Sequence, residues 1–209
     1  MGTRFLALEG IDGAGTTTQS RLLHDWLAAR GQPVLTTREP SDGPIGTVLR
    51  HAMGGRVRLP EVAGGGFLTS ETIALLFAAD RLDHYESEIR PALAKGLWVI
   101  SDRYLDSSLA YQGSMLSPDW VETINRFAPP PDLTLYLDVD VDVALGRISS
   151  TRTGTDLFEK RDVLVRVREN YLRLYEQPDR PVRVIAPLPS VKETFQAMVD
   201  IVSGMFDLS

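Results

Sequence analysis

Short apolar segments alternate with longer amphipathic ones along most of the chain. The apolar segments are bounded by turn-forming residues, as is typical of buried strands, and cover residues 5–8, 34–37, 97–100, 133–137 and 182–185. Between them apolar positions recur at helical spacing, which predicts helices near residues 17–30, 45–53, 70–95, 118–127, 141–149, 160–176 and 191–206. This alternation favours a parallel sheet covered by helices on both faces, an α/β fold.

Two stretches interrupt the alternation and are predicted to be loops. Residues 54–66 are rich in glycine and contain Pro60, and residues 149–156 are almost wholly small and polar around Arg152. The second stretch lies between two expected helices late in the chain, and a polar loop in such a place can serve as a closing lid. We therefore expect one domain, residues 1–209, with a lid insert at about residues 147–160.

Composition narrows the class of protein. The chain has 209 residues, of which 43% are hydrophobic and 24% charged, as in ordinary globular proteins. Its net charge of -6 argues against a general binder of nucleic acid or membrane surfaces. It contains no cysteine, and its three histidines are scattered, so neither disulfides nor a zinc site are expected. Without a signal-peptide pattern or a long apolar run, we expect a cytoplasmic enzyme.

The segment after the first expected strand carries a damaged phosphate-binding motif. Gly10, Gly15 and Thr17 fit the pattern G-x-x-x-x-G-K-[ST], but Thr16 stands where the lysine should be. Glycines allow backbone N–H groups to face an anion, and a following helix N-terminus adds partial positive charge. A glycine-rich turn without any ligand is the alternative. The motif predicts an ATP-binding loop of Gly10, Ile11, Asp12, Gly13, Ala14, Gly15, Thr16, Thr17 and Thr18.

Charged residues follow several of the expected strands. They occur at Arg38-Glu39-Pro40, at Asp102-Arg103-Tyr104 and at Asp138. Open α/β sheets bind ligands beyond the carboxyl ends of their strands, where arginine can hold phosphate and a carboxylate can hold Mg²⁺. A simple pairing of Arg38 with Asp102 would explain one such pair. It would not explain the coincidence at several strand ends.

The chain resembles the thymidylate kinase family of P-loop nucleoside monophosphate kinases. Six motifs in one order carry the resemblance: EGIDGAG at 9–15, TREP at 37–40, LFAADR at 76–81, SDRY at 101–104, SSLAYQG at 107–113 and PDLTLYLD at 131–138. The resemblance implies a P-loop NTPase three-layer α/β/α fold with a five-stranded parallel sheet and a short lid. It also implies a homodimer that needs Mg²⁺ and transfers the γ-phosphate of ATP to dTMP, giving dTDP for dTTP biosynthesis.

The same resemblance implies an acceptor site for dTMP, made of Asp12, Arg38, Phe77, Arg81, Arg103, Ser107, Tyr111 and Gln112. Phe77 would stack on thymine, and Arg81, one helical turn later, would hydrogen-bond the base edge. Arg38 and Arg103 would hold the acceptor phosphate. Tyr111 would crowd the 2′ position of the sugar, so that deoxyribose fits better than ribose.

Further roles concern the sugar and the metal. Asp12 would accept a hydrogen bond from the 3′-hydroxyl. Thr17 and Asp102 would hold Mg²⁺, and Glu9 would support its water shell or else cap the P-loop backbone. Because the phosphate of dTMP is already ionised, alignment and charge neutralisation replace a strong general base.

Thr16 is the main departure from the family pattern, because a hydroxyl brings no charge to the β–γ bridge. We expect Arg152, with Arg147 or Lys160, to close over the transferring group; an arginine finger can contribute about 10³–10⁵ in rate. The expected catalytic residues are Asp102, Arg103, Arg147, Arg152 and Lys160. The alternatives are a nucleotide-binding protein with lost or weak catalysis, and a related nucleotide kinase with another acceptor.

Overall fold

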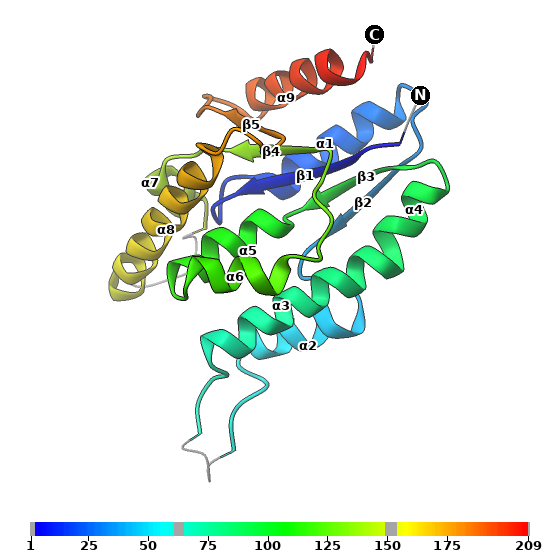
Figure 1. Cartoon of the computed structure of the whole chain (residues 1–209). Coiled ribbons are helices and arrows are strands. Elements are labelled where there is room, and N and C mark those ends of the chain that lie inside the picture. Colours follow the sequence, from blue (N-terminus) through cyan, green and yellow to red (C-terminus); the bar gives the residue numbers. More distant parts are fainter. Residues whose placement is uncertain (1–2, 61–64, 149–153, 209) are drawn as a thin grey trace.

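The computed structural model describes residues 3–60, 65–148 and 154–208. These residues form a five-stranded parallel sheet with the order β2-β3-β1-β4-β5 (Figure 1). The strands are β1 (Phe5–Gly10), β2 (Val34–Arg38), β3 (Trp98–Asp102), β4 (Leu133–Leu137) and β5 (Val182–Ile185). The predicted α/β class and the position of every expected strand are confirmed.

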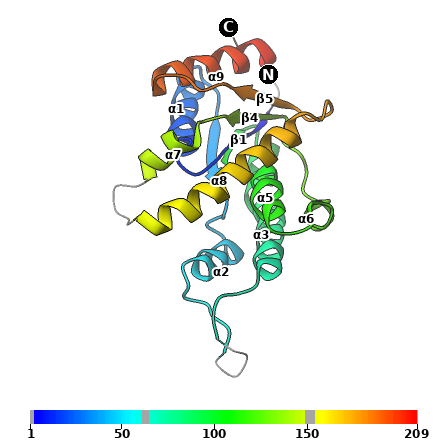
Figure 2. The ribbon, with the colours of Figure 1, turned by 90° about the vertical axis from the view of Figure 1, so that its left-hand side faces the viewer.

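Helices connect the strands and surround the sheet. They are α1 (Thr16–Ala28), α2 (Pro44–Met53), α3 (Ser70–His84), α4 (Arg90–Ala94), α5 (Leu105–Tyr111), α6 (Pro118–Asn125), α7 (Val141–Ile148), α8 (Gly154–Tyr175) and α9 (Val191–Phe206), with a π-turn η2 (Tyr85–Ile89) and a 3₁₀ turn η3 (Gln112–Ser114). Figure 2 shows α8 lying beside α5 and α7. Among the residues described, no helix is long and apolar enough to cross a membrane.

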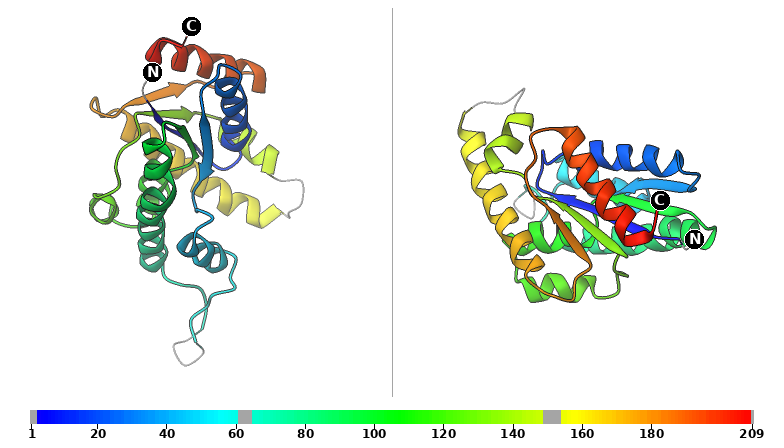
Figure 3. Two further views of the ribbon diagram at one scale, coloured as in Figure 1. Left: turned by 90° about the vertical axis from the view of Figure 1, so that its right-hand side faces the viewer. Right: turned by 90° about the horizontal axis from the view of Figure 1, so that it is seen from above.

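The sheet is buried on both faces. Helices α1 and α9 cover one face, and α4 and α5 cover the other (Figure 3). Side chains of a strand point alternately to the two faces, so neighbouring residues of β1 enter different clusters. Leu6 shares one buried cluster with Leu23 of α1, whereas Phe5 shares a second with Ile89 of η2. The continuous apolar runs in the sequence follow from this burial on both sides.

Two helical expectations need correction. Residues 149–156 were expected to be a loop, but α8 already begins at Gly154; residues 149–153, including Arg152, lie outside the described part. Small polar residues are common at helix starts as well as in loops, so composition alone misplaced this boundary. The expected helix over 70–95 is interrupted by the π-turn η2 before Pro91, whose ring cannot continue a regular hydrogen-bond ladder.

The carboxyl ends of the central strands bring the sequence motifs to one edge of the sheet. In the parallel register Arg38 at the end of β2 lies opposite Asp102 at the end of β3, and Leu8 of β1 lies opposite the same Asp102. The P-loop follows β1 directly, at residues 10–15. The motifs that were far apart in sequence therefore meet at one edge.

Candidate functional site

The P-loop leads from β1 into the N-terminus of α1. Gly13 and Gly15 have φ values of 85° and 99°, a region that favours glycine. A Cβ on Gly13 would clash with the carbonyl oxygen of Ala144, so α7 packs directly against the loop. In front of the loop lies a cleft of about 390 Å³, lined by Gly13, Gly15, Thr16, Thr17, Thr18, Arg38, Glu39, Asp102, Arg103 and Arg147. We call it the phosphate cleft.

Thr17 and Asp102 form a close pair at the phosphate cleft. The Thr17 hydroxyl donates to Asp102 Oδ2 at 2.5 Å, and Oδ1 of the same carboxylate is buried without a hydrogen-bond partner among the described residues. A hydroxyl beside an unpaired carboxylate oxygen is a donor set that suits a hard cation such as Mg²⁺. The described residues contain no group of three or more His, Cys, Asp or Glu side chains arranged to hold a metal by themselves.

Glu9 lies away from the phosphate cleft, fully buried. Its Oε1 accepts from the backbone N–H groups of Tyr104 and Ser107, and its Oε2 accepts from the hydroxyls of Ser107 and Tyr171. Burial, and next the charge of Asp106, raises its pKa to about 7. Glu9 thus holds the turn between β3 and α5, rather than the P-loop backbone.

The positive charge beside the P-loop comes from Arg147, because Thr16 carries none. The Thr16 side chain is buried to 6% exposure at the first position of α1, and it brings no cation. Arg147, in the last turn of α7, donates from Nη1 to the carbonyl oxygens of Gly13 and Ala14 at 3.1 and 3.2 Å. Of the other expected cations, Lys160 lies on α8 and is not among the residues that line the phosphate cleft.

Arg103 connects the P-loop to α5. Its φ of 72° is unusual for a residue with a side chain, and it turns the guanidinium back toward β1. Nη1 donates to the carbonyl oxygen of Gly10 at 2.7 Å, and Nη2 donates to Asp12 Oδ1 at 3.0 Å. Burial alone would lower the pKa of Arg103, but the nearby tyrosines, Asp12 and Glu9 raise it. The side chain is a permanent cation between the two sides of the site.

Tyr111 of α5 contacts the P-loop. Its hydroxyl accepts from the Asp12 N–H at 2.8 Å and donates to Asp12 Oδ1 at 3.0 Å. Arg103 stacks over the Tyr111 ring at 5.3 Å. These contacts fix the ring beside Asp12, in the place where the sequence analysis expected the sugar of the acceptor.

A second cavity, of about 330 Å³, opens on the side of α3 and α5, and we call it the acceptor cavity. It is lined by Asp12, Glu39, Pro40, Met53, Ile73, Phe77, Arg81, Arg103, Tyr104, Ser107, Tyr111, Gln112 and Met115. The structure therefore brings together every expected acceptor residue except Arg38, which lies at the phosphate cleft and pairs with Asp42 at 2.9 Å. Gln112 is buried, and its Oε1 has no partner among the described residues.

Arg81 is more deeply buried than its expected role suggested. It is 1% exposed, and its Nη2 donates to Glu39 at 2.7 Å, to Ser108 at 2.9 Å and to the Tyr104 carbonyl at 3.1 Å. Its Nη1 donates to Asn125. Only Nε lacks a partner among the described atoms. The guanidinium is therefore held rigidly at the wall of the acceptor cavity.

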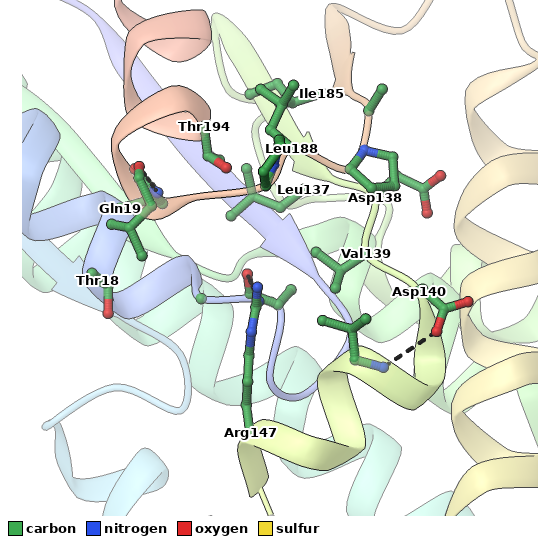
Figure 4. A pocket seen from close by; sticks show the side chains of 17 residues that line it. Thr18, Gln19, Leu137, Asp138, Val139, Asp140, Arg147, Ile185, Leu188 and Thr194 are labelled. Carbon is green, nitrogen blue, oxygen red and sulfur yellow. Dashed lines mark hydrogen bonds between the residues drawn. The ribbon is translucent and has the colours of Figure 1, made fainter.

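A third cavity, of about 460 Å³, lies on the opposite side of the P-loop, and we call it the donor cavity. It is walled by Thr18 and Gln19 of α1, by residues 137–140 after β4, by Arg147 and by residues 185–189 before α9 (Figure 4). Figure 4 shows the Arg147 side chain extending from α7 toward the P-loop. Gln19 Nε2 donates to the Val191 carbonyl at 2.9 Å and so ties α1 to α9.

Sequence reasoning missed the wall of the donor cavity formed by residues 185–189, because a proline-rich connection carries no charge or motif. It also missed Ile73 in the acceptor cavity. Ile73 precedes Phe77 by one helical turn, so the helical periodicity of α3 was a signal that could have found it.

Comparisons with known proteins agree on one family. Residues 8–198 match the family model described as thymidylate kinase. A probable thymidylate kinase of Pyrococcus horikoshii is 42% identical over 201 residues, which cover 95% of each chain. A thymidylate kinase of Leifsonia xyli is 40% identical over 192 residues, covering 88% of each. The crystal structure of a thymidylate kinase from Ehrlichia chaffeensis matches 97% of this chain and 100% of its own, with a TM-score of 0.75 and 25% identity.

Proposed function

The chain belongs to the thymidylate kinase family, and from this premise we propose that it transfers the γ-phosphate of ATP to dTMP, giving ADP and dTDP. The observation that carries the proposal is the continuity of the three hollows. Arg147 lines both the donor cavity and the phosphate cleft, and Arg103 lines both the phosphate cleft and the acceptor cavity. Two nucleotides can therefore meet with their phosphates end to end over the P-loop.

ATP occupies the donor cavity in this proposal. Its base lies between Arg147 and the proline-containing wall at residues 185–189, and its phosphates reach the P-loop. The positive φ of Gly13 and Gly15 and the start of α1 supply backbone N–H groups and partial positive charge to the anion. Thr18, which lines both the donor cavity and the phosphate cleft, marks the path between base and phosphates.

The acceptor dTMP occupies the acceptor cavity. Phe77 stacks on the base, and Arg81 and Gln112 contact its polar edge, since each has a buried atom without a hydrogen-bond partner among the described residues. Asp12 and Tyr111 meet the sugar. Ser107 supports this side of the site by accepting from Arg103 at 3.2 Å.

The acceptor phosphate lies between Arg38 and Arg103, beside the donor. Arg38 is 62% exposed in its side chain, so it can leave Asp42 and turn toward an incoming phosphate at little cost. Arg103 is already fixed. The attacking oxygen is ionised before reaction, so the chain needs only to align the two phosphates and neutralise their charge.

Mg²⁺ fits beside Thr17 and Asp102, because the Thr17 hydroxyl contacts Asp102 Oδ2 and the buried Oδ1 has no hydrogen-bond partner among the described residues. When bound, it supplies positive charge to the β- and γ-phosphate oxygens. Asp102 then has a positioning role for the donor. Glu9 is occupied by four hydrogen bonds, so its contribution is to hold the turn that carries Tyr104 and Ser107.

Arg147 takes over part of the charge that the P-loop lacks at Thr16. It is held against the loop by two carbonyl oxygens, and it lines the phosphate cleft. We keep Arg152 and Lys160 as further cations of a lid at about residues 147–160 that closes over the donor. Arg152 lies outside the described residues, so its role rests on the sequence.

A homodimer is also part of the proposal. Val48 of α2 and Leu75 of α3 are 47% and 50% exposed on two helices that pack together, which leaves apolar surface available to a second copy. Size-exclusion chromatography with light scattering measures the mass. A monomer at micromolar concentration would remove the dimer from the proposal without affecting the reaction.

The decisive experiment measures ADP formation by the purified protein with ATP and Mg²⁺, comparing dTMP, dUMP, dCMP and thymidine at equal concentration. We expect the highest kcat/KM with dTMP. Turnover with thymidine but not dTMP would indicate another acceptor. Family membership does not favour the alternative of a binder without turnover, and ATP binding with no turnover of any acceptor would overturn our proposal.

A further inference from the structure

His84 ends α3 inside the protein, on the far side of Glu39 from Arg81. It is 1% exposed. Its Nδ1 lies 3.3 Å from Glu39 Oε1, and its Nε2 lies 2.8 Å from Thr37 Oγ1 and 3.1 Å from Glu88 Oε2. Neither the phosphate cleft nor the acceptor cavity has His84 in its wall. Its contacts therefore require an explanation other than direct substrate binding.

The hydrogen-bond pattern favours the imidazolium form of this histidine. Thr37 donates its hydroxyl proton to Glu88 Oε2 at 2.7 Å, so its oxygen is left to accept from His84 Nε2. The other ring nitrogen faces a carboxylate oxygen of Glu39. Both nitrogens thus face acceptors, and a ring that donates from both carries a positive charge.

The charges around His84 agree with this assignment. Glu39 follows β2, Glu88 belongs to η2, and Asp80 lies one turn earlier on α3; Asp42 also feels the charge of the ring. Burial would lower the pKa of His84, but the attraction of Glu39, Glu88 and Asp80 raises it. Arg81 is the second cation that contacts Glu39, at 2.7 Å.

Glu39 is therefore held between two cations by its two oxygens. Oε1 faces His84, and Oε2 accepts from Arg81. Glu39 is 2% exposed in its side chain, yet it lines both the phosphate cleft and the acceptor cavity, and Arg81 lines the latter. The chain of contacts ends at Glu88, which is 42% exposed. Removing the contact of His84 therefore frees one oxygen of the Glu39 carboxylate, which orients Arg81.

We propose that His84 is a positioning residue for the acceptor nucleotide: as a cation between Glu88 and Glu39 it fixes Glu39, and Glu39 fixes Arg81 against the acceptor base. The inference deepens the proposed function and rests on it, since it assumes that Arg81 meets the base. It assigns His84 no contact with substrate. Recognition of the base then depends on the protonation of a residue outside the cavity.

Two variants distinguish the contact made by Nδ1 of His84 from the contacts made by Nε2. In His84→Asn the amide can occupy the place of Nδ1 and keep the bond to Glu39, whereas in His84→Gln it can occupy the place of Nε2 and keep only the bonds to Thr37 and Glu88. We expect His84→Gln to raise the KM for dTMP about tenfold, as for one lost charge-assisted hydrogen bond, with kcat and the KM for ATP little changed. His84→Asn should raise the KM for dTMP less than His84→Gln does, because its amide still donates to Glu39 although without the positive charge. Equal values in both variants, or losses in kcat and both KM values together, would overturn the proposal.

The matched control is His24→Gln. His24 lies on α1, and its Nδ1 contacts Thr36 at 3.0 Å, on the same strand as Thr37 but without contact to Glu39. Its kinetics should equal those of the wild type. The wild-type protein itself separates the two proposals. Absence of dTMP turnover there contradicts the proposed function, whereas normal wild-type turnover with an unchanged KM for dTMP in His84→Gln contradicts only the role of His84.

A measurement on the wild type does not depend on the His84 variants folding. The chain has three histidines, so ring-labelled protein gives a simple NMR titration in which His24→Gln and His51→Gln assign the signals. If protonated His84 favours the bound acceptor, binding must in turn raise the pKa of His84. Thymidine is the probe, because it fills the base site without bringing phosphate charge. An upward shift at saturating thymidine supports the proposal, and no shift contradicts it.

Discussion

The guanidinium of Arg147 donates hydrogen bonds to the carbonyl oxygen of Gly13, 3.1 Å away, and to that of Ala14. A cation is thereby fixed on the P-loop of a chain whose P-loop has Thr16 in place of lysine. Since both residues line the phosphate cleft, a lysine at position 16 and the arginine at 147 would act on the same phosphates. Their effects on catalysis should therefore be coupled.

A double-mutant cycle measures this coupling. We expect Arg147→Ala to lower kcat by about 10²–10³, the cost of removing one preorganised donor to developing charge. Thr16→Lys should change the wild type little but restore part of the activity in the Arg147→Ala background. Steady-state ADP formation gives all four values. Strictly additive effects would contradict the shared role.

Arg161→Ala is the control for this cycle. Arg161 is an arginine of the neighbouring helix α8, and it pairs with Asp142 at 2.7 Å, with both side chains exposed. We expect a surface pair of this kind to contribute little, so kcat and both KM values should stay at the wild-type level.

The second prediction concerns the binding of Mg²⁺ at Asp102 and Thr17. Asp102→Asn should lower kcat by about 10³ and shift the Mg²⁺ dependence to higher concentration, because the neutral amide loses the charge that attracts the cation. Thr17→Val should shift the Mg²⁺ dependence in the same direction but reduce kcat less. Activity measured against Mg²⁺ at saturating nucleotides tests both. An unchanged Mg²⁺ midpoint in Asp102→Asn would place the metal elsewhere.

The architecture could be predicted from the sequence because local patterns carry that information, whereas the candidate site was what the resemblance to the family implied. Buried strands read as short apolar runs, and Phe77 and Arg81 share a helix face that leads both to one cavity. Long-range partners leave no such trace. That Arg81 is bonded to Glu39 and Asn125, 42 and 44 residues away, depends on how α3, α6 and the end of β2 pack together.

Glu9 shows the same limit at a single residue. Its position at the end of a strand, before the P-loop, was compatible with a metal-supporting role or with capping the loop. The hydroxyl of Tyr171, 162 residues later, is one of its four donors, and only the packing of α8 against α5 brings that hydroxyl near. No spacing in the sequence could have indicated that contact.

The raised pKa of Glu9 predicts how the stability of the folded protein depends on pH. Its carboxyl pKa in the folded protein is raised from 4.5 to about 7, so the folded protein binds this proton more tightly than the unfolded chain does. The stability that this proton gives is complete below pH 4.5 and is lost as the pH rises through about 7. We expect Glu9→Gln, in which the amide oxygen can face the backbone donors of Tyr104 and Ser107, to lack this loss.

Thermal unfolding of the wild type and of Glu9→Gln across this pH range tests the prediction. Subtracting the unfolding temperature of the wild type from that of the variant removes the effect of other titrating groups. This difference should become more positive as the pH rises. Glu122→Gln is the control, since Glu122 is 70% exposed. A difference that does not vary with pH would mean that folding does not raise the pKa of Glu9.

Tyr111 separates a ring effect from a hydroxyl effect in sugar selection. Its ring lines the acceptor cavity, while its hydroxyl holds Asp12 through two hydrogen bonds. Tyr111→Phe should lower kcat/KM for dTMP about tenfold through the loss of these bonds, yet keep the preference for dTMP over the ribonucleotide, because the ring still crowds the 2′ position. Tyr111→Ala should lose the preference, and competition assays with both nucleotides measure it. If Tyr111→Phe lost the preference as fully as Tyr111→Ala, the hydroxyl and its contact with Asp12 would select the sugar, and the ring would serve only as packing.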